Sequence, residues 1–106
     1  MQSDLILLVQ LFVHPGQETA LRQFEQHAAQ IMQKYGGRLE HVIHPIAWEQ
    51  AVAADCPYEI HLVRFPTLEQ FEAYRHDPDL AQLLPLREAA IARTEILHCQ
   101  AVPSPS

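Results

Sequence analysis

A small set of polar side chains stands among otherwise apolar segments and defines the chemistry open to this chain. The candidate catalytic residues are His61, Tyr74 and Arg87, and the candidate ligand-binding residues are Gln10, His14 and Arg64. A histidine titrates close to neutral pH and can exchange protons with a phenol or an enol. An arginine holds a carboxylate or an oxyanion through its fork of N–H donors. We therefore expect His61 to accept a proton, Tyr74 to orient a bound molecule and Arg87 to stabilise negative charge.

The same residues also fit structural roles. Arg87 could pair with Glu88 or Asp79. The tyrosine could pack in the core with its hydroxyl at the edge. Arg64 either forms a salt bridge with Glu40 across a hairpin or faces the mouth of a pocket. The strand register decides between these two positions, and the residue pattern leaves both open.

Seven histidines raise the question of a metal site, but their spacing does not favour one. His41 and His44 are three residues apart on an expected strand, so their rings point to opposite faces and cannot share an ion. The chain has no H-E-x-x-H motif and no C-x-x-C pair. Cys56 and Cys99 are expected to be free thiols. We predict no metal site and no cofactor.

The overall composition limits the range of partners. The net charge is −6, from thirteen acidic and seven basic residues, and no basic cluster is present. A phosphate backbone would be repelled, so nucleic acid is not an expected partner. The first residues, MQSDLILLVQLFV, lack a basic segment and a cleavage site, and their apolar run is too short to span a bilayer. We predict a cytoplasmic protein without a membrane partner.

The expected elements alternate in a recognisable order. Strands are predicted at Leu5–Val13, Arg38–Ile46, Tyr58–Phe65 and Thr94–Val102; helices are predicted for about twenty residues after Pro15-Gly16, after Thr67, from Pro78 and over Leu86–Arg93. Thr67 and Asp77 are expected helix caps, and Pro85 is expected to restart the last helix. This order predicts an α+β, ferredoxin-like split βαβ fold (βαββαβ) with a four-stranded antiparallel sheet. Residues 1–102 would form its single domain, and residues 103–106 a flexible tail.

Alternation along the first strand separates two faces. One face carries Leu5, Leu7, Val9, Leu11 and Val13, and the other carries Ile6, Leu8, Gln10, Phe12 and His14. We expect the second face, which holds two polar side chains, to line a cavity. The strands are apolar on both faces, whereas the helices can cover only one. The bare face therefore predicts a homodimer packed sheet against sheet.

The segment RFPTLEQFEAYRHDPDLAQLLPLREAA resembles the signature half of a small domain-of-unknown-function family within the dimeric α+β-barrel superfamily. Its motif positions are filled here by Phe65, Pro66, Thr67, Tyr74, Asp77, Pro78 and Arg87, while Ala73 stands where the family often has Trp. The segment FVHPGQETALRQFEQHAAQIMQKYGGR is similar to the first strand and helix of the superfamily, including antibiotic-biosynthesis-monooxygenase-like members. The resemblance implies a dimeric barrel fold and leaves the activity open.

Haem-degrading members of the superfamily depend on an Asn, a Trp and a helical His. This chain contains no Asn, and its single tryptophan, Trp48, lies in an expected loop. Haem is therefore not expected.

Two functions agree with these observations. The first is a homodimer that binds, and as an enzyme also transforms, a small apolar or aromatic molecule in a pocket between sheet and helices. Such an enzyme would resemble cofactor-independent monooxygenases or isomerases. The alternative is a non-catalytic binding or assembly module, in which the histidines and arginines serve packing and the dimer interface.

Overall fold

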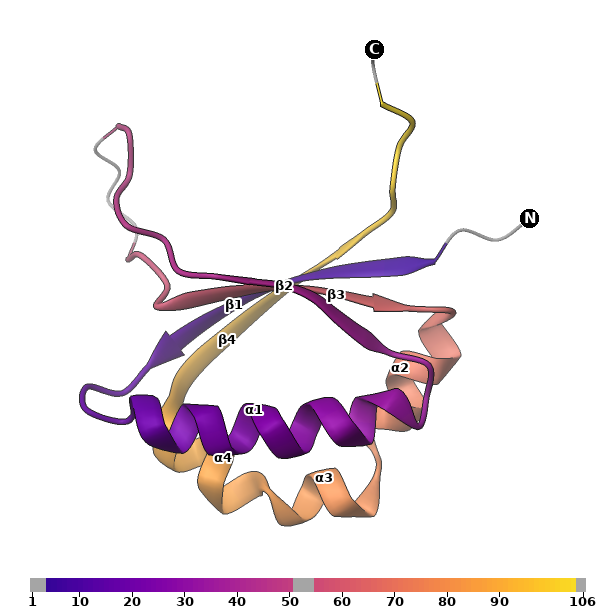
Figure 1. Ribbon diagram of the computed structural model, residues 1–106, viewed down its shortest axis with the longest axis horizontal. Coiled ribbons are helices and arrows are strands. Elements are labelled where there is room, and N and C mark those ends of the chain that lie inside the picture. The colour runs from indigo at the N-terminus through magenta and orange to yellow at the C-terminus, as the bar shows by residue number, and fades with distance from the viewer. Residues whose placement is uncertain (1–3, 51–54, 105–106) are drawn as a thin grey trace.

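A computed structural model of the chain describes residues 4–50 and 55–104. Its elements are β1 (Leu5–Val13), α1 (Glu18–Gln33), β2 (Arg38–Ile43), β3 (Glu59–Phe65), α2 (Leu68–Arg75), α3 (Pro78–Gln82), α4 (Leu84–Ala90) and β4 (Ile91–Cys99). The strands form one antiparallel sheet in the order β2-β3-β1-β4. Figure 1 shows the helices on one side of this sheet. The predicted ferredoxin-like fold is confirmed.

Local signals set the boundaries of the second helical region. The Thr67 hydroxyl accepts a hydrogen bond from the Gln70 backbone N–H at 3.1 Å, and the Asp77 carboxylate caps α3 by accepting from the Asp79 N–H at 2.7 Å. Pro85 lies in the first turn of α4, where its missing N–H costs no helical hydrogen bond. The predicted caps and the helix restart are therefore confirmed.

The last strand begins earlier than predicted. β4 starts at Ile91 rather than Thr94 and ends at Cys99 rather than Val102. Ile91 pairs with Val13 of β1 and is buried, so pairing with the central strand overrides the helical pattern of this segment. For the same reason the last helix ends at Ala90 rather than at the predicted Arg93, and it begins at Leu84 rather than Leu86.

The second strand also differs from its prediction. β2 ends at Ile43 rather than Ile46, and the last residue pair in its ladder joins Ile43 to Ile60. Beyond Ile43 the chain diverges from β3, so the residues that follow have no strand with which to form ladder hydrogen bonds.

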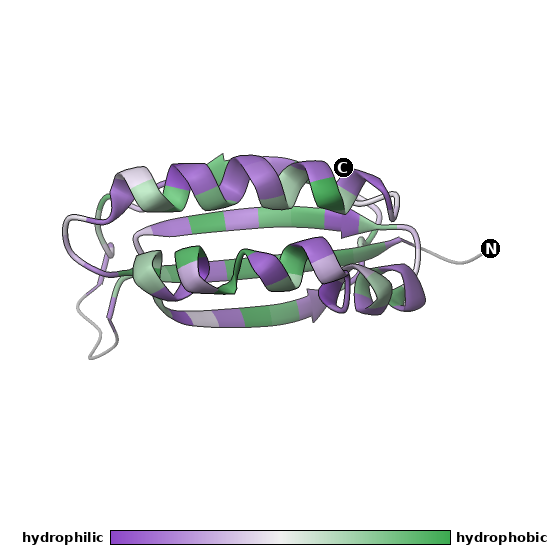
Figure 2. Cartoon of the chain, turned by 90° about the horizontal axis from the view of Figure 1, so that it is seen from below, coloured by the Kyte–Doolittle hydropathy of each residue, from purple (hydrophilic) through white to green (hydrophobic). Residues whose placement is uncertain are grey.

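Two apolar clusters pack between the sheet and the helices. One contains Leu7, Met32, Val63, Phe65 and Phe71, and the other contains Leu11, Leu21, Ala90 and Ile91. Figure 2, seen from the helix side, shows green apolar residues on the strands that are visible between the helices. Ile96 points to this side from the edge strand β4 but is 41% exposed. The helices therefore leave part of β4 uncovered.

The opposite face of the sheet carries no helix and is rich in apolar side chains. Leu8 of β1 pairs with Leu62 of β3 on one side and with Leu97 of β4 on the other. These leucines form a row across three strands, and Leu97 is 60% exposed. This uncovered surface, called the open face below, combines the leucine row with polar side chains such as Gln10 and Arg64, and it agrees with the predicted sheet face without helices.

Two segments extend from the sheet on the side away from the helices (Figure 1). One follows β2 and carries Ile46 and Trp48, which are 99% and 52% exposed. The other follows β4 and carries the exposed Val102. Within the described ranges, no helix is long and apolar enough to cross a membrane.

Candidate functional site

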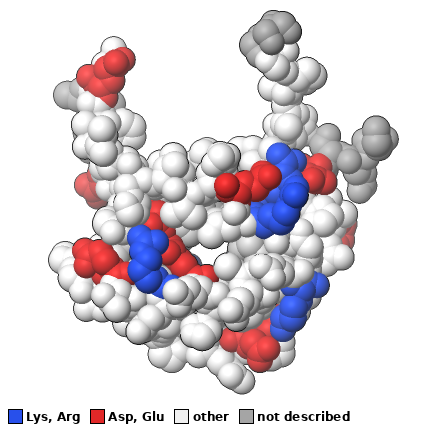
Figure 3. Space-filling model, viewed as in Figure 1, with Lys and Arg blue, Asp and Glu red and all other residues white. Residues whose placement is uncertain are grey.

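A cavity of about 440 Å³ lies between the sheet and the helices. Its walls come from every strand and from each of the four helices, and they are mainly apolar. The space-filling view is hollowed between the two layers (Figure 3). A volume of this size is within the usual range for small-molecule sites.

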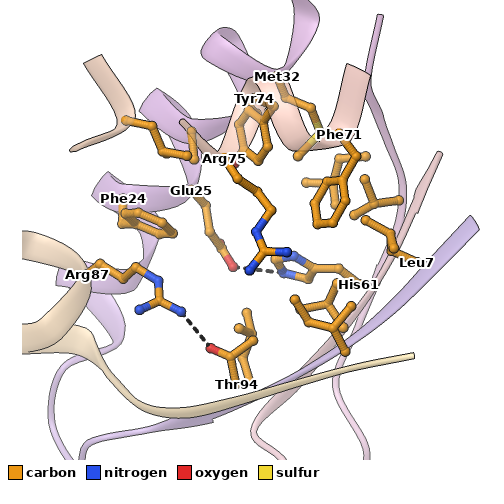
Figure 4. Close-up of a pocket in the computed structure, with 18 of the residues that line it drawn as sticks. Leu7, Phe24, Glu25, Met32, His61, Phe71, Tyr74, Arg75, Arg87 and Thr94 are labelled. Carbon is orange, nitrogen blue, oxygen red and sulfur yellow. Dashed lines mark hydrogen bonds and ion pairs between the residues drawn. The ribbon is translucent and has the colours of Figure 1, made fainter. Parts of the chain in front are cut away.

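The structure brings the predicted catalytic residues together at this cavity. His61 lines it from β3, Tyr74 from α2 and Arg87 from α4. Figure 4 shows them with Glu25 and Arg75, two lining residues that the sequence analysis did not select.

The predicted ligand-binding residues do not line the cavity. Gln10 pairs with Ile60 and Glu95 on the open face. Arg64 also lies on that face and binds Glu40 at 2.9 Å, which agrees with its structural alternative. His14 is exposed in the turn after β1, where its backbone N–H donates to the carbonyl of Ala90.

The choice of cavity face for the first strand was therefore wrong. The cavity is lined by Leu7, Val9 and Leu11, which belong to the other set of alternating residues. The helices cover the more uniformly apolar face of β1, because burial of that face costs no unpaired polar group.

An ion network with largely buried acids and exposed outer cations closes one side of the cavity. The Nε2 atom of His61 lies 2.9 Å from Glu25 Oε2 and 2.6 Å from Glu59 Oε2. The Oε1 atoms of both glutamates bind Arg22 at 2.6 Å, and His44 Nε2 lies 2.7 Å from Glu59 Oε1. The Glu59 side chain is fully buried. Arg22 thus fixes the outer oxygens of the two acids, and His61 meets the inner ones.

The network shifts the pKa values of Glu25, Glu59 and His61. Burial alone would raise the pKa of Glu59, but hydrogen bonds with Glu25, His61, Arg22 and His44 outweigh it and lower that pKa to about 2. Burial, together with the neighbouring Glu59, raises the pKa of Glu25. Burial alone would lower the pKa of His61, yet its bonds to both glutamates raise that pKa. Glu59 is therefore the permanent anion of the network.

The carboxylates also select the nitrogen of His61 that can react. They occupy Nε2, so in the neutral imidazole the proton lies on Nε2 and the lone pair on Nδ1. Nδ1 forms no side-chain hydrogen bond within the described residues. Every fully buried side-chain nitrogen or oxygen in that part of the chain has a hydrogen-bond partner, so an Nδ1 atom without one is not fully buried. Nδ1 is therefore the atom available to a molecule in the cavity.

Tyr74 and Arg87 offer different donors to the same space. Burial raises the pKa of Tyr74 to about 12, only partly offset by Arg87, so its hydroxyl keeps its proton at neutral pH. The Arg87 guanidinium donates to Thr94 Oγ1 at 3.2 Å (Figure 4). It forms no ion pair with Glu88 or Asp79, its two structural alternatives, within the described residues.

One group of side chains has the composition of a metal site. Oxygen and nitrogen atoms of Glu25, Glu59 and His61 lie within 4.8 Å of one another. Arg22 already neutralises one carboxylate charge, and a protonated His61 neutralises the other. A cation would have to displace the imidazole proton from this balanced network. His41 and His44 lie on opposite sides of the sheet, as predicted, because His41 pairs with Leu62 and His44 contacts Glu59.

The glutamates of the network had a visible signal in the sequence. Glu59 and His61 are two residues apart on one strand and therefore share a face. Glu25 interrupts the apolar stripe of α1, between Leu21 and Ala28. A charged residue at such a position indicates a buried polar site. Both cysteines, Cys56 and Cys99, are free thiols, as predicted.

The fold and cavity define a ferredoxin-like α+β protein with a cavity of small-molecule size. The chain belongs to the family described as Domain of unknown function (DUF1330), which matches residues 8–99. The resemblance of its second half to such a family is confirmed. A comparison with curated proteins gives no match.

Solved structures share the fold at low sequence identity. A protein of unknown function from Rhodopseudomonas palustris is 11% identical with a TM-score of 0.84, over 98% of this chain and 86% of that one. SnoaB, a cofactor-independent oxygenase from Streptomyces nogalater, is 9% identical with a TM-score of 0.70, over 98% of both chains. A dimeric protein of unknown function and ferredoxin-like fold from Bacteroides fragilis is 10% identical with a TM-score of 0.67, over 94% of this chain and 98% of that one.

Proposed function

We propose that this protein binds a small, largely apolar or aromatic molecule in its cavity and exchanges a proton with it through His61. The observation that most directly supports this proposal is an apolar cavity of about 440 Å³ lined by His61, whose Nε2 atom is bound by the largely buried carboxylates of Glu25 and Glu59. A carboxylate on one imidazole nitrogen fixes the tautomer and stabilises the imidazolium when the other nitrogen takes a proton.

The chemistry needs only side chains of this chain. Neutral His61 takes a proton from carbon beside a carbonyl, the electron pair moves to the carbonyl oxygen, and the imidazolium returns the proton to the same or another carbon. The protonated Tyr74 hydroxyl is suited to donate a hydrogen bond to the enolate oxygen. This is an isomerase-type step. The fold shared with a cofactor-independent oxygenase supports a proposal in which the protein supplies the base.

Deuterium exchange tests the proton transfer. Phenylacetone in D₂O should exchange its benzylic protons faster with the protein than without it, followed by NMR. The His61→Gln variant should lose about 10²–10⁴-fold of this acceleration, the usual contribution of a positioned base. The rate should rise as the pH increases through the raised pKa of His61, because only the neutral ring accepts a proton.

A variant of Glu25, which positions His61, tests whether His61 acts as a base or only stabilises the fold. Glu25→Gln removes a hydrogen bond that raises the pKa of His61, so the pH profile should move to lower pH. His76→Gln, at the end of α2, should leave rate and profile unchanged. Equal acceleration by wild type and His61→Gln would refute the proposed base.

The competing function is the non-catalytic binding or assembly module. It is favoured by the ion network itself, since Arg22, Glu25, Glu59 and His61 satisfy one another without a ligand. In that case the histidine serves stability, and no exchange is accelerated. Native mass spectrometry of protein taken directly from cells would identify a retained molecule and so separate binding from assembly.

We further propose that the protein is a homodimer joined through its open face. Support comes from the row of Leu62, Leu8 and Leu97, in which Leu62 and Leu8 are half-buried and Leu97 is exposed, and from the extended segments carrying Ile46 and Trp48 beside it. The Bacteroides fragilis protein of the same fold is described as dimeric. Burying this row against a second copy removes apolar surface from water.

A substitution on the open face tests this assembly. Leu97→Asp should convert the dimer to a monomer at micromolar concentration in sedimentation equilibrium, because it places a charge in the proposed apolar contact. Leu68→Asp is the matched control, since Leu68 is similarly exposed, at 48%, but lies on α2 in the helical layer. A monomeric wild-type protein under these conditions would rule out the proposed dimer.

A further inference from the structure

Arg87 differs from the other basic residues of this acidic chain. Each of the other six lysine and arginine side chains lies within 4.0 Å of a carboxylate oxygen: Arg22, Lys34, Arg38, Arg64, Arg75 and Arg93. Among the described residues, Arg87 has no such partner, and its side-chain bond goes to the neutral hydroxyl of Thr94. Its positive charge is therefore left without an anion.

This unpaired guanidinium lies at the cavity. Arg87 lines the cavity from α4 and is exposed, so it stands at the opening rather than in the interior. Arg75 lines it from α2, with its guanidinium 5.2 Å from the centre of the Phe71 ring. Figure 4 shows both arginine side chains extending toward the space among the lining residues.

The remaining lining separates into an apolar body and a polar inner wall. Leu7, Phe24, Met32 and Ile91 line the apolar part, while Glu25 and His61 form the buried polar wall. A ligand that matches these surfaces carries an anion at one end and a ring in the middle.

We infer that the cavity binds a small aromatic carboxylate, with the carboxylate on Arg87 and Arg75 and the ring among the apolar lining residues. The inference rests on the proposed function and adds the chemical class of the ligand. A guanidinium matches the two oxygens of a carboxylate with parallel N–H donors, and such charge-assisted bonds are stronger than neutral ones. The Arg87 guanidinium has five N–H donors and makes one side-chain hydrogen bond within the described residues, to Thr94, so it retains donors for a carboxylate. The acids of the inner wall repel a carboxylate and so direct it to the arginine end.

A pair of isosteric probes tests the charge. 2-Naphthylacetate should bind one molecule per chain, and 2-naphthylacetamide, which has the same ring but no charge, should bind about tenfold more weakly. Titrations can be followed by ligand-observed NMR. Arg87→Gln should reduce the affinity for the carboxylate several-fold and remove most of the preference over the amide, because Arg87 is the unpaired cation of the site while Arg75 also binds Glu72.

Matched variants assign the effect to the cavity. Arg93→Gln removes an exposed arginine from the open face and should leave both affinities unchanged. Arg87→Lys should restore part of the preference, because a point charge remains without the planar fork. Since Arg87 is exposed, thermal melts of Arg87→Gln should match wild type and show that the variant is folded.

The outcomes separate this inference from the proposed function. Equal affinity for the two probes overturns the anionic ligand, and an undiminished preference in Arg87→Gln overturns the placement of the carboxylate on Arg87. Either outcome leaves an apolar ligand and the His61 exchange intact. Failure of both probes to bind counts against the anion site and the aromatic cavity together. A carboxylate preference lost in Arg87→Gln and kept in Arg93→Gln supports the assignment.

Discussion

Replacing Phe71 with alanine should lower the free energy of unfolding by about 3–5 kcal/mol, as expected for deletion of a core aromatic side chain. Phe71 is 4% exposed and belongs to the cluster around Phe65, whose ring centre lies 5.3 Å away. It also lines the cavity, so its removal would enlarge a space that the helices do not close. Urea denaturation at a fixed protomer concentration measures the loss.

The same helix provides the control for this prediction. Leu68 lies one turn before Phe71 on α2 and is 48% exposed. Leu68→Ala should cost less than about 1 kcal/mol, because little apolar surface is lost from the core. A Phe71→Ala loss below that of Leu68→Ala would mean that the helix buries a different face.

The substitution Glu59→Gln is expected to destabilise the fold by about 3 kcal/mol. Removal of one partner from a buried ion pair leaves an uncompensated charge, and Glu59 is the fully buried anion facing Arg22 and His61. The expected value is at the lower end of the usual range because Glu25 still compensates both cations. Chemical denaturation of the two proteins gives the difference.

The pH of this measurement follows from the two pKa shifts. Glu59 has a lowered pKa in the fold, so its stabilisation is present above its ordinary value of 4.5 and is lost as the pH falls toward about 2. His61 has a raised pKa, so its stabilisation is present below 6.5 and is lost as the pH rises through the raised value. Between pH 4.5 and 6.5 both contributions are present, and the difference between wild type and variant should be largest.

A surface carboxylate serves as the comparison for Glu59. Glu40 pairs with Arg64 at 2.9 Å, but both side chains remain partly exposed. Glu40→Gln should therefore change the stability by less than about 1 kcal/mol. Equal effects of the two substitutions would show that burial does not control the energy of the network.

The architecture was predictable because its signals are local and repeated. The nine-residue run Leu5–Val13, apolar apart from Gln10, predicted the observed limits of β1. The capping patterns at Thr67 and Asp77 located the starts of α2 and α3. The start of β4 was missed because Ile91 joins the sheet only through its pairing with Val13. That partner is distant in the chain, so no local pattern shows it.

The site was predictable only in part. His61, Tyr74 and Arg87 were selected by type and position, and they do line one cavity. Gln10 was assigned to the wrong side because alternation separates two faces without saying which one the helices cover. Glu25 comes from α1 and meets His61 across 36 residues, a contact that depends on helix packing rather than on spacing.

The pleat of β3 has a consequence for future experiments. Glu59 and His61 point to the side covered by the helices, where His61 lines the cavity, while Ile60 and Leu62, their immediate neighbours, point to the open face. Substitutions at adjacent positions of β3 therefore reach two different surfaces, the cavity for which we propose ligand binding and the open face for which we propose self-association. A mutant library that varies only Glu59 and His61, or only Ile60 and Leu62, changes one face of β3 and leaves the other face as an internal reference.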